Sequence, residues 1–398
     1  MLLFLIEYLT SLGWKVPVAF GNVSTRLLFS GFTALLFTIL LGPRCIKKLY
    51  ELKTGQSIRV EDCPMLAQLH EKKKNTPTMG GILILAAMLT SLILWMDLRS
   101  SFTLILCVIT IGLGLVGGYD DYLKLKHKNS QGLRARKKFL FQILLAALIG
   151  AYTLFPHLAE KIHVGKWFKP PVAKEQVHKV AVVLKTDEYM GTYYVPFFKD
   201  PVFILKGTLV SLAFFITIFV FVGSSNAVNL TDGLDGLASG CIVLASSVLG
   251  LVAFLSNNFE MARYLNILYI DGSGEIAIYL CAMMGACLGF LWYNGYPAQV
   301  FMGDTGSLAL GGILGAAAIL LRKEGLLGIV GGIFVAEALS VILQVGSYKL
   351  RHKKRIFLCA PLHHHFEYKG WPETKVVLRF WLCGLILAVI GLFSLKLQ

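Results

Sequence analysis

Ten long apolar runs constrain this chain more than any other feature of its sequence. A helix that crosses a bilayer needs about 20 mainly apolar residues. Such runs lie near residues 24–43, 79–97, 102–119, 139–156, 206–224, 236–256, 276–293, 306–321, 326–347 and 376–396. Only 15% of the 398 residues are charged, whereas about a quarter are charged in a soluble domain. The sequence therefore predicts an all-α integral membrane protein, with ten transmembrane helices in one polytopic domain over residues 1–398.

The basic residues indicate how these helices are oriented. The net charge of +15 would suit a nucleic-acid-binding protein, but 22 of the 38 Lys and Arg residues lie in the loops after the first, third and ninth runs. Loops rich in Lys and Arg stay in the cytoplasm. We therefore predict that these three loops are cytoplasmic and that both termini lie outside. The charge is then a topology signal, and we expect no nucleic-acid partner.

Two segments fall outside the ten runs. Residues 1–23 begin with an apolar stretch too short to span a bilayer, and we expect an interfacial N-terminal segment. Residues 157–205 form a long loop after the fourth predicted helix. The stretches 179–185 and 192–198 are β-prone, with a possible turn at 187–191, and predict a small external β-hairpin.

Three glycine-flanked acidic clusters interrupt the apolar sequence. They are Gly117–Asp121, Asn226–Gly236 and Phe301–Ser307. Asn, Asp and Thr also cap helices, but unrelated caps would be scattered over both faces, and these clusters all fall on the predicted cytoplasmic face. Carboxylates from separate helices are the ligand type that Mg²⁺ prefers, and it shares its other positions with substrate phosphates. The clusters predict one Mg²⁺-dependent phosphate site containing Asp120, Asp121, Asp232, Asp235 and Asp304.

Further polar residues lie on the same predicted face. Lys73 and the basic loops could neutralise a diphosphate, although Lys73 could also serve only as a topology lysine, and Thr78 could donate a hydrogen bond. The consecutive residues His363, His364 and His365 point in different directions, so they rarely bind one metal. At least one of them is a candidate donor to a phosphate or a sugar. Glu337 interrupts the ninth run, where a charge is expensive, so it either faces a polar cavity or pairs with a neighbour.

Five motifs in this order carry a family resemblance. Residues 73–81, 118–122, 226–236, 296–307 and 361–367 together resemble the phospho-N-acetylmuramoyl-pentapeptide transferases, a branch of the polyprenyl-phosphate N-acetylhexosamine-1-phosphate transferases. The resemblance implies a Mg²⁺-dependent enzyme of the bacterial inner membrane, usually a homodimer, with its active site on the cytoplasmic face. It also implies the transfer of phospho-N-acetylmuramoyl-pentapeptide from UDP to undecaprenyl phosphate, which gives lipid I and UMP in peptidoglycan synthesis.

The same resemblance implies roles for individual residues. Asp304 matches the family's Mg²⁺ ligand, and Asp120 and Asp121 match the pair proposed to deprotonate the lipid phosphate. Phe301 would stack on uracil. The other residues that match the nucleoside-sugar pocket are Lys73, Thr78, Asn229, Asp232, Gly233, Leu234, Asp235, Asn294 and Gln344, with His363, His364 and His365 lining the same cleft.

Some alternatives stay open at the level of sequence. A sister transferase that uses UDP-N-acetylglucosamine would keep the aspartates, although the triple histidine favours the muramoyl-pentapeptide branch. A secondary transporter would also carry glycine-broken helices, but it would place its polar groups near the bilayer midplane. An aspartate nucleophile that forms a covalent intermediate is an alternative to direct attack by the lipid phosphate.

Overall fold

The fold is a bundle of apolar helices. The computed structural model describes residues 1–52, 73, 76–127, 132–165, 167–177 and 180–396. Among these residues, nine helices are long and apolar enough to cross a membrane. They are α2 (Val23–Glu51), α5 (Ser101–His127), α6 (Ala135–Leu154), α9 (Val210–Thr231), α10 (Leu237–Ser256), α12 (Gly274–Asn294), α13 (Gly303–Leu320), α15 (Gly332–Leu350) and α17 (Glu373–Lys396). The chain is a multi-pass membrane protein.

The predicted count of ten spans is not confirmed. The run at 79–97 forms α4 (Gly81–Trp95), whose 15 residues are fewer than the roughly 20 that a perpendicular crossing requires. The run at 326–347 is broken into α14 (Glu324–Val330) and α15, with Gly331 between them. Two adjacent glycines weaken a helix at this point, since glycine has the lowest helix propensity of any residue except proline.

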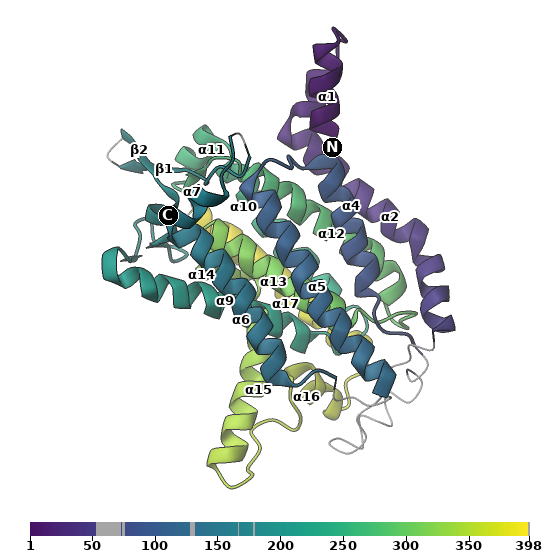
Figure 1. The fold of residues 1–398 in the computed structure, drawn as a ribbon. Helices are drawn as coiled ribbons and strands as arrows, with labels where there is room; N and C mark the ends of the chain where they lie inside the picture. The colour runs from purple at the N-terminus through teal and green to yellow at the C-terminus, as the bar shows by residue number, and fades with distance from the viewer. Residues whose placement is uncertain (53–72, 74–75, 128–131, 166, 178–179, 397–398) are drawn as a thin grey trace.

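Helix α13 lies in the middle of the bundle (Figure 1). Every residue from Thr305 to Leu320 is buried, and α13 packs closely against α5 and α9. Helix α12 packs in the same way between α2 and α10. Small residues make these close approaches possible: a side chain at Gly285 of α12 would overlap the carbonyl oxygen of Gly31 on α2.

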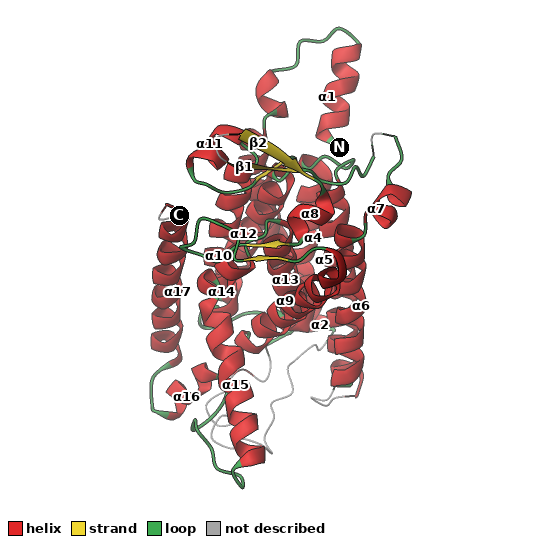
Figure 2. Ribbon diagram, turned by 90° about the vertical axis from the view of Figure 1, so that its left-hand side faces the viewer, coloured by secondary structure: helices red, strands yellow, loops and turns green. Residues whose placement is uncertain are grey.

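The short elements gather mostly at one end of the bundle (Figure 2). There α1 (Leu2–Ser11) and the 3₁₀ turn η1 (Val18–Gly21) precede α2. The remaining short elements of the 157–205 segment and its neighbours are α7 (Pro156–Ile162), β1 (Ala173–Val177), β2 (Val180–Leu184), α8 (Thr186–Met190), β3 (Thr192–Tyr193), β4 (Phe203–Ile204), η3 (Gly207–Leu209), α11 (Phe259–Tyr264) and β5 (Tyr269–Ile270). The opposite end carries α16 (Leu362–Tyr368) beside α15.

The strand pairing within residues 157–205 differs from the predicted hairpin. β2 pairs antiparallel with β1, which also pairs with β5, and β3 pairs with β4. The predicted turn at 187–191 is instead largely the helix α8. The carboxylate of Glu188 accepts a hydrogen bond from the Lys185 backbone N–H, 2.9 Å away, and so fixes the start of that helix. The two β-prone stretches therefore belong to different sheets.

The close packing of α2 on α12 gives a test of the fold. We expect Gly285→Ala to lower stability by about 1–3 kcal/mol, because the new methyl group meets backbone that cannot move without separating the helices. The measurement is the thermal unfolding midpoint of the purified protein in detergent. Gly223→Ala on α9 is the matched control, since a Cβ there meets nothing within 4 Å. Equal midpoints for the two variants would contradict this account of the helix contact.

Candidate active site

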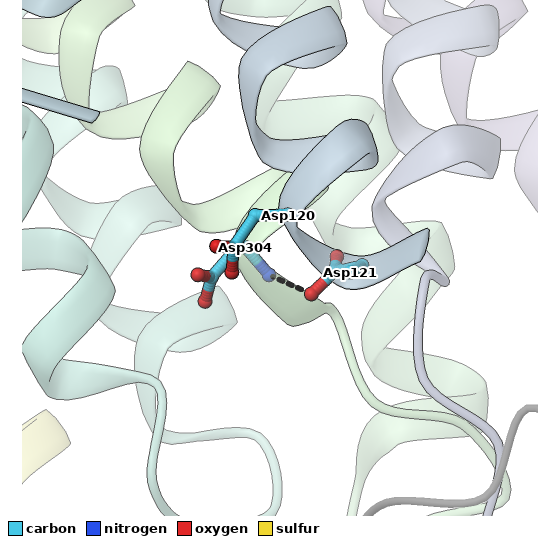
Figure 3. Close-up of side chains that lie close together, drawn as sticks. All are labelled: Asp120, Asp121 and Asp304. Carbon is cyan, nitrogen blue, oxygen red and sulfur yellow. Dashed lines mark hydrogen bonds between the residues drawn. The ribbon is translucent and has the colours of Figure 1, made fainter. Parts of the chain in front are cut away.

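Three aspartates meet where two helices end. Asp120 and Asp121 lie in the last turns of α5, and Asp304 lies in the first turn of α13. One oxygen from each carboxylate lies within 4.8 Å of the others (Figure 3). Gly117 permits this approach, because a side chain there would overlap the Asp304 carbonyl group. We call these three residues the acidic centre.

The Asp121 carboxylate accepts hydrogen bonds from the first residues of α13. Its Oδ2 accepts hydrogen bonds from the Thr305 backbone N–H at 2.9 Å and from the Thr305 hydroxyl at 2.7 Å. Its Oδ1 accepts a third from the Asp304 backbone N–H at 3.2 Å, which is the dashed line in Figure 3. The first amides of a helix have no partner within the helix. Asp121 supplies that partner and so fixes where Asp304 lies.

Two lysines neutralise much of the charge of the acidic centre. The Lys124 ammonium group lies 2.7 Å from Asp120 Oδ2 and 2.9 Å from Asp304 Oδ2. The Lys138 ammonium group, from α6, lies 2.9 Å and 2.5 Å from the same two oxygens. The other oxygen of Asp120 accepts a hydrogen bond from the Leu133 backbone N–H at 2.6 Å. Three carboxylates and two ammonium groups therefore form one partly buried network.

Several predicted residues surround this network. The Asn229 amide of α9 donates to Asp304 Oδ1 at 2.8 Å and to the Ser307 hydroxyl at 2.8 Å. Thr78 lies against Gly303, whose positive φ of 73° suits glycine. Asp232 directly follows α9 and is half-buried. Burial, and then the nearby carboxylates of Asp304 and Asp121, raise the pKa of Asp232 to about 7.

A second group of predicted residues meets beside the acidic centre. The Lys73 ammonium group lies 2.6 Å from Asp235 Oδ1 and 6.0 Å from the centre of the Phe301 ring. Asn294 is buried. Its side-chain oxygen accepts a hydrogen bond from the Gly236 backbone N–H, and its NH₂ group donates one to the Val300 carbonyl group. Leu234, which directly precedes Asp235, is also buried. These contacts hold the 234–236 and 300–301 segments together.

The three histidines lie on α16 and face different neighbours, as the sequence predicts. His363 is buried against Gly233, with its Nδ1 3.1 Å from a carboxylate oxygen of Glu337. His364 Nδ1 lies 2.6 Å from Glu367, and His365 Nδ1 accepts from the Leu358 backbone N–H at 3.1 Å. Of the two alternatives for Glu337, the structure therefore has it paired with a neighbour.

Gln344 is held by the loop that follows α15. Its side-chain oxygen accepts hydrogen bonds from the Ile356 and Phe357 backbone N–H groups, and its amide donates to the Phe357 carbonyl group, all at 3.0 Å. Its hydrogen bonds in the structure thus join α15 to this loop and not to the acidic centre.

The comparisons with known proteins agree with this arrangement. The model of Glycosyl transferase family 4 matches residues 102–322, and phospho-N-acetylmuramoyl-pentapeptide-transferase signature 1 matches residues 73–85. The chain is 63% identical, over the full length of both proteins, to the phospho-N-acetylmuramoyl-pentapeptide-transferase of Protochlamydia amoebophila. It is 46% identical to the protein of that name from Thermodesulfovibrio yellowstonii, over 95% of each chain. The chain belongs to the phospho-N-acetylmuramoyl-pentapeptide-transferase family.

The acidic centre of this transferase offers the right donors for a divalent cation. Its ligand atoms are carboxylate oxygens from Asp120, Asp121 and Asp304, and hard oxygen donors suit Mg²⁺. Asp121 already accepts three hydrogen bonds from α13. Asp304 Oδ2, which lies against the side-chain ammonium groups of Lys124 and Lys138, is therefore the better candidate to hold the ion.

Sequence reasoning missed three charged residues of the transferase site. Within the basic loops, Lys124 and Lys138 were not singled out as site residues, although Lys124 stands four residues after Asp120, where two side chains share a helix face. Glu373 gave no signal of its own. It lies at the start of α17, and its Oε1 is 2.6 Å from the Lys73 ammonium group.

The raised pKa of Asp232 predicts a pH dependence of stability. Because this pKa lies above that of an unfolded aspartate, about 3.9, the neutral carboxyl group stabilises the fold. That contribution is complete below about pH 4 and is lost as the pH rises through about 7. With EDTA present, the thermal midpoint of the transferase should therefore fall, relative to that of Asp232→Asn, between about pH 4 and pH 8.

Asp200→Asn, at an exposed position, is the control for general effects of pH. Parallel midpoint curves for the unmodified protein and Asp232→Asn would show that the Asp232 carboxyl group does not titrate in this range.

Proposed function

We propose that the chain transfers phospho-N-acetylmuramoyl-pentapeptide from its UDP carrier to undecaprenyl phosphate, giving lipid I and UMP. The observation that carries this proposal is the acidic centre, which lies at the ends of two membrane helices with two lysines beside it. The family and the names of both relatives support the same reaction. A site at the end of a membrane helix suits a reaction between a lipid-borne phosphate and a water-soluble nucleotide.

The location of the site follows from the basic loops. We place the acidic centre on the cytoplasmic face of the bacterial inner membrane, because the Lys- and Arg-rich loops lie at the same ends of the helices. Both termini then lie outside, as does the 157–205 segment, and α1 with its exposed apolar residues lies at the interface. A homodimer is proposed on the family resemblance.

Asp120 is the proposed base. The substrate phosphate enters with one acidic proton, and Asp120 takes it, since Asp121 has both of its oxygens engaged by α13. Lys124 and Lys138 would then meet the negative charge of the two phosphates, with ammonium groups that move on flexible side chains. Mg²⁺, when bound by Asp304, would supply charge stabilisation for the diphosphate.

The transfer itself makes one bond and breaks one. An oxygen of the lipid phosphate attacks the sugar-linked phosphorus, and the bond from that phosphorus to the oxygen of UMP breaks. A covalent aspartyl intermediate would need a carboxylate oxygen free to attack. Hydrogen bonds engage Asp121 and Asp120 Oδ1, which leaves Asp120 Oδ2 as the oxygen that such an intermediate would use. We propose direct attack by the lipid phosphate, because that phosphate is already a competent nucleophile.

The nucleotide would lie across the second group of residues. Phe301 offers a ring for uracil, and Lys73, Asn229, Asp232, Gly233, Leu234, Asp235 and Asn294 line its surroundings. The α16 histidines would contact the sugar or its phosphate, and they favour the muramoyl-pentapeptide donor over UDP-N-acetylglucosamine.

The substrate and the metal can be tested together. Purified protein in detergent with undecaprenyl phosphate and Mg²⁺ should release UMP from UDP-N-acetylmuramoyl-pentapeptide, and EDTA should stop the release. UDP-N-acetylglucosamine should give none. Release only from UDP-N-acetylglucosamine would instead indicate the sister transferase, and no release from either donor by folded protein would contradict the proposed reaction.

The acidic centre can be tested by single substitutions. Asp120→Asn and Asp304→Asn should each reduce kcat by at least about 100-fold, in line with the loss of a general base or of charge stabilisation. Asp121→Asn should reduce turnover and also lower the thermal midpoint, because the amide replaces an oxygen acceptor of α13 with a donor. Full activity in any of these variants would remove that residue from the mechanism.

A further inference from the structure

The Lys73 ammonium group lies between two carboxylates. Asp235 Oδ1 and Glu373 Oε1 are each 2.6 Å away. All three side chains are largely buried, with exposed fractions of 18% for Lys73, 1% for Asp235 and 10% for Glu373. We call these residues the Lys73 cluster. One ammonium group would be neutralised by a single carboxylate, so the second carboxylate needs another explanation.

Glu373 also binds the backbone beside Asp235. The oxygen that accepts from Lys73 accepts a second hydrogen bond, at 2.8 Å, from the Asp235 backbone N–H. The other carboxylate oxygen of Asp235, Oδ2, accepts a hydrogen bond from the Ala298 backbone N–H at 2.9 Å. Ala298 stands three residues before Phe301. Glu373 therefore links the start of α17, Lys73 and the loop of Asp235, which in turn binds the backbone of the segment that leads to Phe301.

Helix α17 holds Glu373 firmly in this place. The Trp381 ring of α17 packs directly against Gly240 and lies close to Gly236 at the start of α10. A carboxylate in the first turn of a helix is also stabilised by the helix dipole. Glu373 is thus a fixed acceptor for Lys73 and for the Asp235 backbone.

We propose that Glu373 is a positioning residue for the nucleotide end of the substrate, and this rests on the proposed function. It holds Lys73 and Asp235 in their binding arrangement beside Phe301. Among the described residues, the structure gives Glu373 contacts with this cluster and none with the acidic centre. Its loss should therefore weaken the binding of the uridine nucleotide and leave the chemical step almost unchanged.

The test separates nucleotide binding from turnover. Glu373→Ala should raise the KM for the UDP-sugar, and the Kd for UMP measured by calorimetry, by about tenfold, as for the loss of a charge-assisted hydrogen bond. The kcat and the KM for undecaprenyl phosphate should stay within about twofold. Glu373→Gln keeps an oxygen acceptor for Asp235 and should lose only about threefold. Thr374→Ala, at the exposed next residue, is the control and should match the unmodified protein.

The two proposals fail in different ways. An unmodified protein that binds UMP but transfers no phospho-sugar would contradict the proposed function alone. An active unmodified protein with unchanged nucleotide KM and UMP Kd in folded Glu373→Ala would overturn the role of Glu373, and so would a fall in kcat without a change in KM. If Glu373→Ala does not fold, the Kd for UMP in Glu373→Gln decides, and an unchanged value overturns the proposal.

Discussion

The site depends on how the buried first amides of α13 are satisfied. A helix that begins inside an apolar bundle has backbone N–H groups without partners, and water cannot easily reach them. The Asp121 carboxylate from α5 accepts from two of these groups and from the Thr305 hydroxyl. The same contact brings Asp304 beside Asp120, and Asn229 then closes the other side of Asp304. One buried capping interaction thereby joins three helices into the acidic centre.

Much of the bundle could be predicted because bilayer thickness imposes one length on every span. Nine of the predicted runs form helices long enough to cross, and the short α4 marks the limit of that rule. No such length rule applies to the 157–205 segment, which belongs to no predicted span. Alternating residues predict a strand but do not identify its partner, and β2 pairs with β1 instead of with the residues near β3. Helix α8 takes the place of the expected turn because Glu188 caps it locally.

In the site too, residues with a local sequence pattern could be predicted, whereas residues that depend on distant partners could not. Carboxylates that end apolar runs are visible in the sequence, and Asp120, Asp121 and Asp304 do meet. Lys138 and Glu373 could not be found in this way, because their partners lie far away in the sequence or on other elements. Glu373 lies 300 residues from Lys73 and 138 residues from Asp235. A charged residue in a loop has the same local pattern whether it sets topology or completes a site.

The enclosure of α13 has a consequence for motion. Its glycines lie against neighbouring helices so closely that a side chain at Gly306, Gly311 or Gly312 would overlap α4, α9 or α5. These contacts on several sides restrict sliding and rotation of α13. We therefore expect Asp304 to keep its position when substrates bind. Adjustment to substrates of different size would then come from the long side chains around it, such as Lys124 and Lys138.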